Sequence, residues 1–109
     1  MRFIQAIVRE ERVPFIQKAL GELEIYGMTI RSVMGRGEQK GLSLQFRGGI
    51  LGVDFLPKVS MEIVVQDQDE NAVVQAIEKF GKTGKMGDGR IFVMPLDKSV
   101  RVRSNEVEV

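Results

Sequence analysis

Residues 83–90, with the sequence TGKMGDGR, form the segment whose composition best suits ligand binding. Its glycines allow positive φ angles and let backbone N–H groups approach a ligand closely. Consecutive N–H groups can form an anion nest, to which Lys85 and Arg90 would add positive charge. An ordinary glycine-rich turn between a helix and a strand has the same composition. A phosphate site and a plain turn therefore both remain open from this segment alone.

Arg101 and Arg103 form a second candidate for phosphate binding. Spaced by two in an expected extended segment over residues 100–103, their guanidinium groups would leave the same face about 6.5–7 Å apart. Arginine makes bidentate contacts with phosphate, although two arginines on an edge strand more often protect the strand against aggregation. Together with the glycine-rich segment, the pair favours a nucleotide polyphosphate.

Arg9 and Lys58 are a third candidate pair, because each lies at the end of a strand pattern that borders a loop. Side chains at strand ends can converge on a ligand at the edge of a sheet, and two cations there would suit a dicarboxylate. The alternative is that both are solvated strand-end charges, which is the more common case.

Composition excludes several classes of chemistry. The 109 residues contain neither Cys nor His, so disulfides and thiolate zinc sites are excluded and the commonest general base is missing. The 16 basic and 15 acidic side chains leave a net charge of +1, which gives no long-range attraction to nucleic acid or an acidic membrane. No apolar run approaches the ~18 residues of a membrane span. We expect a soluble, cytoplasmic, non-enzymatic protein that binds no nucleic acid.

Hydrophobic periodicity assigns these candidates to strands and helices. Apolar alternation or two-sided apolar runs predict strands over residues 2–8, 28–34, 59–65 and 91–95. Helical spacing predicts one helix from about Val13 to before Gly27, and a second that is capped by Asp67 or Asp69 and ends at Gly81. The order predicts an α+β fold, a ferredoxin-like βαββαβ sandwich, as a single domain over residues 1–109.

The predicted sheet has more apolar surface than its helices can cover. Two helices cover one face, yet the strands are apolar on both sides, at Phe3, Ile7, Val64, Phe92 and Met94. Self-association is the simplest way to bury the second face, so we expect a homo-oligomer.

Residues 35–58 separate the second and third predicted strands. The segment is far longer than the about 2–5 residues of a hairpin loop, and its apolar residues argue against disorder. It is interpreted as a partner-binding arm whose base, residues 35–41, takes part in the ligand site. A surface excursion without a role is the alternative.

With these features, the chain resembles the PII family of nitrogen-regulatory signal proteins over nearly its whole length. The resemblance is carried by residues 27–29, 35–41, 47–48, 53–58 (VDFLPK), 83–93 (TGKMGDGRIFV) and 101–103 (RVR). It implies a homotrimer that binds ATP or ADP in clefts between subunits. The implied nucleotide contacts are Thr29, Gly35, Gly37, Gly84, Lys85, Gly87, Asp88, Gly89, Arg90, Arg101 and Arg103.

The resemblance also implies an effector and an output. The effector is 2-oxoglutarate, bridged to ATP by Mg²⁺, with Gln39 at the metal; the implied contacts are Arg9, Gln39, Lys40, Gly41, Lys58 and Gly87. The arm corresponds to the family's T-loop, which docks on an ammonium transporter or a nitrogen-assimilation enzyme. The implied partner contacts are Leu44, Phe46, Arg47, Ile50 and Leu51.

The sequence departs from the family pattern at several positions. Leu51 replaces the tyrosine that some members uridylylate, and Gly49 replaces a serine that others phosphorylate, so we expect no covalent control by either route. Glu38 replaces a commonly basic residue, and the C-terminal segment 96–109 is short. The predicted function is a non-enzymatic sensor of ATP or ADP and 2-oxoglutarate. A weak ATPase, or a structural trimer with degenerate ligand sites and a non-standard partner, are the alternatives.

Overall fold

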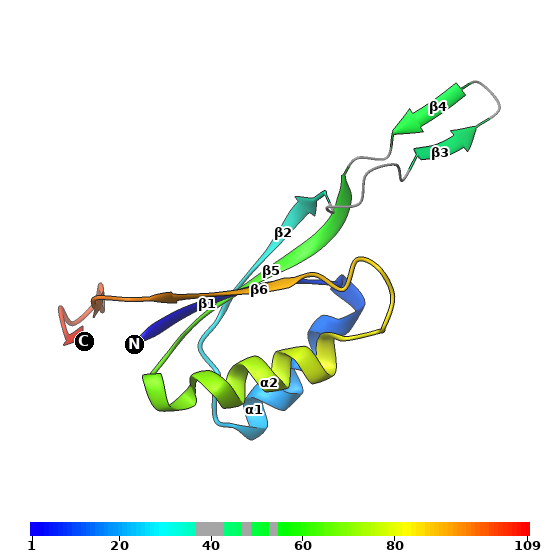
Figure 1. The fold of residues 1–109 in the computed structure, drawn as a ribbon. Coiled ribbons are helices and arrows are strands. Elements are labelled where there is room, and N and C mark those ends of the chain that lie inside the picture. The colour runs from blue at the N-terminus through cyan, green and yellow to red at the C-terminus, as the bar shows by residue number, and fades with distance from the viewer. Residues whose placement is uncertain (37–42, 47–48, 53–54) are drawn as a thin grey trace.

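The computed structural model describes residues 1–36, 43–46, 49–52 and 55–109. Two helices cover one face of a four-stranded antiparallel sheet (Figure 1), whose strand order is β2-β5-β1-β6. The elements are β1 (Arg2–Val8), α1 (Val13–Glu22), β2 (Thr29–Gly35), β5 (Leu56–Val65), α2 (Glu70–Gly81) and β6 (Arg90–Pro95). The predicted α+β, ferredoxin-like arrangement is confirmed.

The core lies between the helices and the sheet face that they cover. Alternate residues of β1 and β5 point towards the helices, and α1 and α2 each present a buried stripe at helical spacing. The buried apolar side chains are Ile4, Ala6, Val8, Ile16, Ala19, Leu20, Val59, Met61, Ile63, Val65, Val73 and Ile77. None of the helices in the described part of the chain is long and apolar enough to cross a membrane.

The opposite face of the sheet has no helix over it and carries large apolar side chains. Val64 of β5 is 44% exposed, and Phe92 and Met94 of β6 are each 43% exposed. In the register of the sheet, Phe3 pairs with Val64 on one side and with Met94 on the other. This apolar row is the surface that the sequence predicted to need a cover.

The first helix begins at Val13, as predicted, and ends at Glu22, before the predicted end. A short 3₁₀ turn precedes each helix, η1 (Glu10–Arg12) before α1 and η2 (Asp67–Asp69) before α2. The expected cap by Asp67 or Asp69 is wrong, because α2 has no side-chain capping hydrogen bond. Asp67 instead lies 2.9 Å from the N-terminal ammonium group. The hydrogen bond from this ammonium group, and next its positive charge, hold the pKa of the Asp67 carboxyl below its ordinary value.

The segment predicted as one long loop contains regular structure. β3 (Ser43–Phe46) pairs antiparallel with β4 (Gly49–Gly52), beyond the ends of β2 and β5 (Figure 1). The predicted boundaries also shift, because Gly35 belongs to β2 and Leu56–Lys58 belong to β5. Gly37, Gln39, Lys40, Gly41 and Arg47 lie outside the described residues. For Leu44, Phe46, Ile50 and Leu51 the structure describes the strand backbone only.

The expected extended segment over residues 100–103 is wrong. Only Ser99–Val100 is a strand (β7), and it pairs with β8 (Val107–Glu108) across a turn. The amide of Asn105 donates to the carbonyl of Arg101, and the Arg101 amide donates to the carbonyl of Glu106. Asn105 adopts a φ of 60°, a conformation that asparagine tolerates better than most residues. This closed turn replaces the extended geometry.

Candidate functional site

The glycine-rich loop between α2 and β6 depends on glycine at three positions. Gly84, Gly87 and Gly89 have φ angles of 83°, 94° and 100°, where a residue with a Cβ is strained. At Gly89 the packing also excludes any side chain, because a Cβ would lie 1.7 Å from the carbonyl oxygen of Ile7. The loop is therefore fastened against the end of β1 by a contact that only glycine allows.

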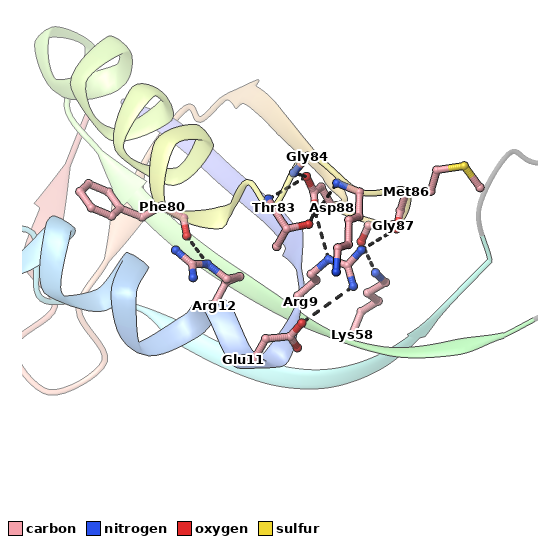
Figure 2. A network of polar contacts seen from close by, with 11 residues as sticks. Arg9, Glu11, Arg12, Lys58, Phe80, Thr83, Gly84, Met86, Gly87 and Asp88 are labelled. Carbon is pink, nitrogen blue, oxygen red and sulfur yellow. Dashed lines mark hydrogen bonds and ion pairs between the residues drawn. The ribbon is translucent and has the colours of Figure 1, made fainter.

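Asp88 organises this loop from within (Figure 2). Its Oδ2 atom accepts hydrogen bonds from the amides of Thr83 and Gly84, both at 2.9 Å. Its Oδ1 atom accepts from the Thr83 hydroxyl at 2.5 Å and from Arg9 Nε at 3.0 Å. These hydrogen bonds, led by the one from the Thr83 hydroxyl, hold the pKa of the Asp88 carboxyl far below its ordinary value.

The Asp88 contacts change the interpretation of the loop as an anion nest. The amides of residues 83 and 84 already bind a carboxylate, and that carboxylate belongs to the chain itself. A phosphate would have to use amides further along the loop or the neighbouring cations. Asp88 was predicted as a nucleotide contact, but in the structure its carboxylate binds Thr83 and Gly84 of its own loop.

Arg9 and Lys58 converge on the same loop. Arg9, directly after β1, donates from Nη2 to the carbonyl of Met86 at 2.5 Å, and Lys58 of β5 donates to the carbonyl of Gly87. A Cβ placed on Gly87 would be 3.1 Å from Lys58 Nζ and 3.4 Å from Arg9 Nη2, so both cations lie against this glycine. Burial, and next the charge of Arg9, lower the pKa of Lys58. Two cations therefore meet here, and the carboxylates of Asp88 and Glu11 partly offset their charge.

Arg12 binds the end of α2, directly before the glycine-rich loop begins. Its Nε donates to the carbonyl of Phe80 in the last turn of α2 at 2.7 Å, and its guanidinium lies 4.3 Å from the centre of the Phe15 ring. Arg9 also lies 3.8 Å from Glu11. The sequence analysis missed Arg12 and Glu11; the only available signal was a cluster of charges directly after the first strand.

Several other predicted contacts lie at this end of the sheet. Gly35 ends β2 opposite Leu56, and a Cβ added to it would lie 3.3 Å from Lys58 Cγ. Arg90 begins β6 opposite Ile7. The Lys85 amide donates to the Thr83 hydroxyl at 3.2 Å. Thr29 lies at the start of β2, opposite Glu62, and is therefore distant from Gly35 at the other end of the strand.

Arg101 and Arg103 are not brought to the loop of their own chain. β6 leads away from the loop, and the C-terminal segment lies near the N-terminus at the opposite end of the sheet (Figure 1). A six-residue strand such as β6 spans about 20 Å. The two arginines and the glycine-rich loop of one chain therefore cannot bind the same phosphate.

A hollow of about 450 Å³ lies between the end of α2 and β6, on the helix side of the loop. Its walls combine apolar residues with charges of both signs: Val8, Ile77, Glu78, Gly81, Lys82, Asp88, Gly89, Arg90 and Ile91. This mixture favours neither anions nor cations. Within the described ranges, no three Asp or Glu side chains gather as a metal site would require.

Comparison with known proteins gives one consistent family. The family model described as "Nitrogen regulatory protein P-II" matches residues 1–106. Nitrogen regulatory protein P-II 1 of Methanothermobacter thermautotrophicus is 44% identical over 106 residues, which cover 97% of this chain and 92% of the relative. Nitrogen regulatory protein P-II of Pasteurella multocida is 42% identical over 106 residues, covering 97% of this chain and 95% of the relative.

Proposed function

The chain belongs to the P-II family of nitrogen regulatory proteins, so it is a signal-transduction regulator of nitrogen metabolism, and we propose that it works as a ligand sensor without enzymatic activity. The proposed ligands are ATP or ADP, together with 2-oxoglutarate and Mg²⁺. The proposed output is a change in the 35–58 arm that alters its docking on an ammonium transporter or a nitrogen-assimilation enzyme in the cytoplasm. Leu51 offers no tyrosine hydroxyl, so the signal would come from ligands alone.

One observation carries the effector part of the proposal. Arg9 and Lys58, distant in sequence, meet against Gly87, where Lys58 and Arg9 Nη2 donate to main-chain carbonyl oxygens while Arg9 Nε donates to Asp88. A carboxylate is a stronger acceptor for an ammonium or guanidinium group than a neutral carbonyl. An anionic ligand entering here could take the donors of Lys58 and Arg9 Nη2 from these carbonyls, while Asp88 keeps Arg9 Nε. Gln39, Lys40 and Gly41 are proposed to complete the effector and Mg²⁺ contacts.

The nucleotide part of the proposal requires more than one chain. The glycine-rich loop and the pair Arg101 and Arg103 lie at opposite ends of the sheet. We place the nucleotide at a seam where the loop, Gly35 and Gly37 of one subunit meet the arginines of another. The apolar face that includes Val64 and Phe92 is the proposed contact between three copies, which would bury the exposed row.

The 35–58 arm is placed so that a ligand bound at Lys58 could change its conformation. β2 and β5 run from the covered core to the arm, and Gly35 and Lys58 lie on these strands where they reach it. A ligand that changes the contacts of Lys58 therefore acts at the root of the arm. Such a ligand can shift the arm between conformations only as far as it binds one of them better.

Isothermal titration with a Lys58→Met variant tests the effector site. With Mg²⁺-ATP present, we expect 2-oxoglutarate binding to weaken about 10–100-fold, the cost of losing a charged hydrogen bond, while ATP affinity changes little. Lys98→Met, a substitution of an exposed lysine in the C-terminal segment, is the matched control. If the parent protein bound neither ATP nor 2-oxoglutarate, the sensing proposal would be wrong.

A further inference from the structure

The C-terminal hairpin brings two carboxylates to Arg101. Arg101 Nε lies 3.9 Å from Glu106 Oε2, and Arg101 Nη2 lies 3.6 Å from Glu108 Oε1. The backbone sets this geometry, because the Arg101 amide donates to the Glu106 carbonyl at 2.9 Å and Ser99 pairs with Glu108. The two acidic residues are therefore held beside the arginine whenever the hairpin is formed.

These ion pairs are exposed and loose. The side chains of Arg101, Glu106 and Glu108 are 63%, 71% and 50% exposed. Exposed pairs of this kind contribute little to stability, so a phosphate that binds the same guanidinium can displace them. Displacement does not remove the carboxylates, since the backbone keeps them within a few ångströms of the ligand's negative charge.

We propose that Glu106 and Glu108 set the nucleotide affinity of this protein by competing for Arg101, and that they disfavour ATP more than ADP. The inference rests on the proposed function, because it assumes that Arg101 binds the nucleotide phosphates. Each carboxylate lowers the affinity in two ways: it occupies the guanidinium in the free protein and repels the bound phosphates. ATP carries one more negative charge than ADP, so the repulsion acts on it more strongly.

A structural role of the same contacts would have the opposite effect. If the two carboxylates served to orient Arg101 for phosphate binding, removing their charge would release the side chain and weaken nucleotide binding. The sign of the affinity change therefore separates competition from orientation.

The test compares nucleotide affinities of the assembled parent protein with those of Glu106→Gln, Glu108→Gln and the double variant. Isothermal titration with ATP and with ADP at ~50 mM salt should show about three- to tenfold tighter ATP binding for the double variant, with a smaller gain for ADP. Raising the salt to ~0.5 M should shrink the difference, because the Debye length falls to a few ångströms. Glu22→Gln, at an exposed glutamate at the end of α1, is the charge-matched control for each single variant.

Each outcome has a distinct meaning. Unchanged or weaker ATP binding in the double variant, with normal binding by the parent, would overturn the competition and leave the proposed function intact. A gain in Glu22→Gln equal to that of either single variant would also overturn it, since net charge alone would then explain the effect. A parent protein that binds neither nucleotide would remove both the inference and the proposal on which it rests.

Discussion

Asp88 shows how one side chain can set the conformation of a glycine-rich loop. Glycines make the loop permissive, but permissive backbone does not choose one conformation. The choice comes from a carboxylate that accepts from two amides of the loop, a hydroxyl and the guanidinium of Arg9. Because Arg9 is 79 residues away in sequence, the same contact fastens the loop to the end of the first strand.

The first prediction at this scale is that Asp88→Asn destabilises the protein by about 1–3 kcal/mol at neutral pH, since it weakens charge-assisted hydrogen bonds. The pKa of Asp88 is lowered in the folded state, so the unfolded chain takes up the proton first as the pH falls. The stabilisation is thus present above the ordinary carboxyl pKa and is lost below about pH 4. The gap between parent and variant in denaturant unfolding should narrow in that range.

Asp97→Asn supplies the control for this measurement, because it removes an exposed carboxylate elsewhere on the chain. Its effect should be small at every pH. A gap between the parent and Asp88→Asn that stays constant from pH 7 to pH 3 would show that the carboxylate charge does not stabilise the loop.

At the scale of elements, the longer segments could be predicted and the short ones could not. β1, β5, α1 and α2 carry apolar periods over seven or more residues, which is enough to identify type and buried face. β7 and β8 are two residues each, and they depend on backbone hydrogen bonds around Arg101 that leave no pattern in the side chains. The extended geometry expected for Arg101 and Arg103 was wrong for that reason.

The candidate site also has a part that could be predicted from the sequence and a part that could not. The sequence identified Arg9 and Lys58 as strand-end cations, because each follows from its own strand pattern. That both meet at Gly87 depends on the pairing of β1 with β5 and on the return of the chain through α2, which local patterns do not encode. Arg12 was missed because its partner is a main-chain carbonyl at the end of α2, and carbonyls have no sequence signature.

A prediction at this scale concerns the junction between η1 and α2. Arg12→Ala removes a cation and a donor from the last turn of α2, where both stabilise the free carbonyls. We expect a loss of about 1–2 kcal/mol in stability and faster hydrogen exchange of the amides of residues 82–89. Arg12→Lys should fall between parent and Ala, because lysine keeps the charge but not the planar contact with Phe15.

Lys18→Ala, on the exposed side of α1, is the control for Arg12. It should leave exchange in residues 82–89 unchanged. If Arg12→Ala exchanged no faster there than Lys18→Ala, the end of α2 would be shown to hold the loop without help from η1.

At the scale of the whole molecule, one explanation accounts for both the uncovered sheet face and the two separate parts of the proposed phosphate site. The row of Val64, Phe3 and Met94 is an apolar surface on the side away from the helices. Arg101 and Arg103 lie too far from the glycine-rich loop of their own chain to share its ligand. Packing several copies through the uncovered face would bury the apolar row. It would also bring the arginines of one copy to the glycine-rich loop of another.

The last prediction uses one substitution to test both the association of the chains and the nucleotide affinity that depends on it. Val64→Glu places a charge in the middle of the apolar row, where burial of an unpaired carboxylate is costly, so sedimentation at micromolar concentration should show monomers in place of the proposed trimers. Leu23→Glu, at a comparably exposed apolar position beside α1, should remain trimeric. The monomeric variant should also lose nucleotide affinity at least tenfold, although no proposed nucleotide contact is altered. A Val64→Glu monomer with full nucleotide affinity would show that a single chain makes the whole site.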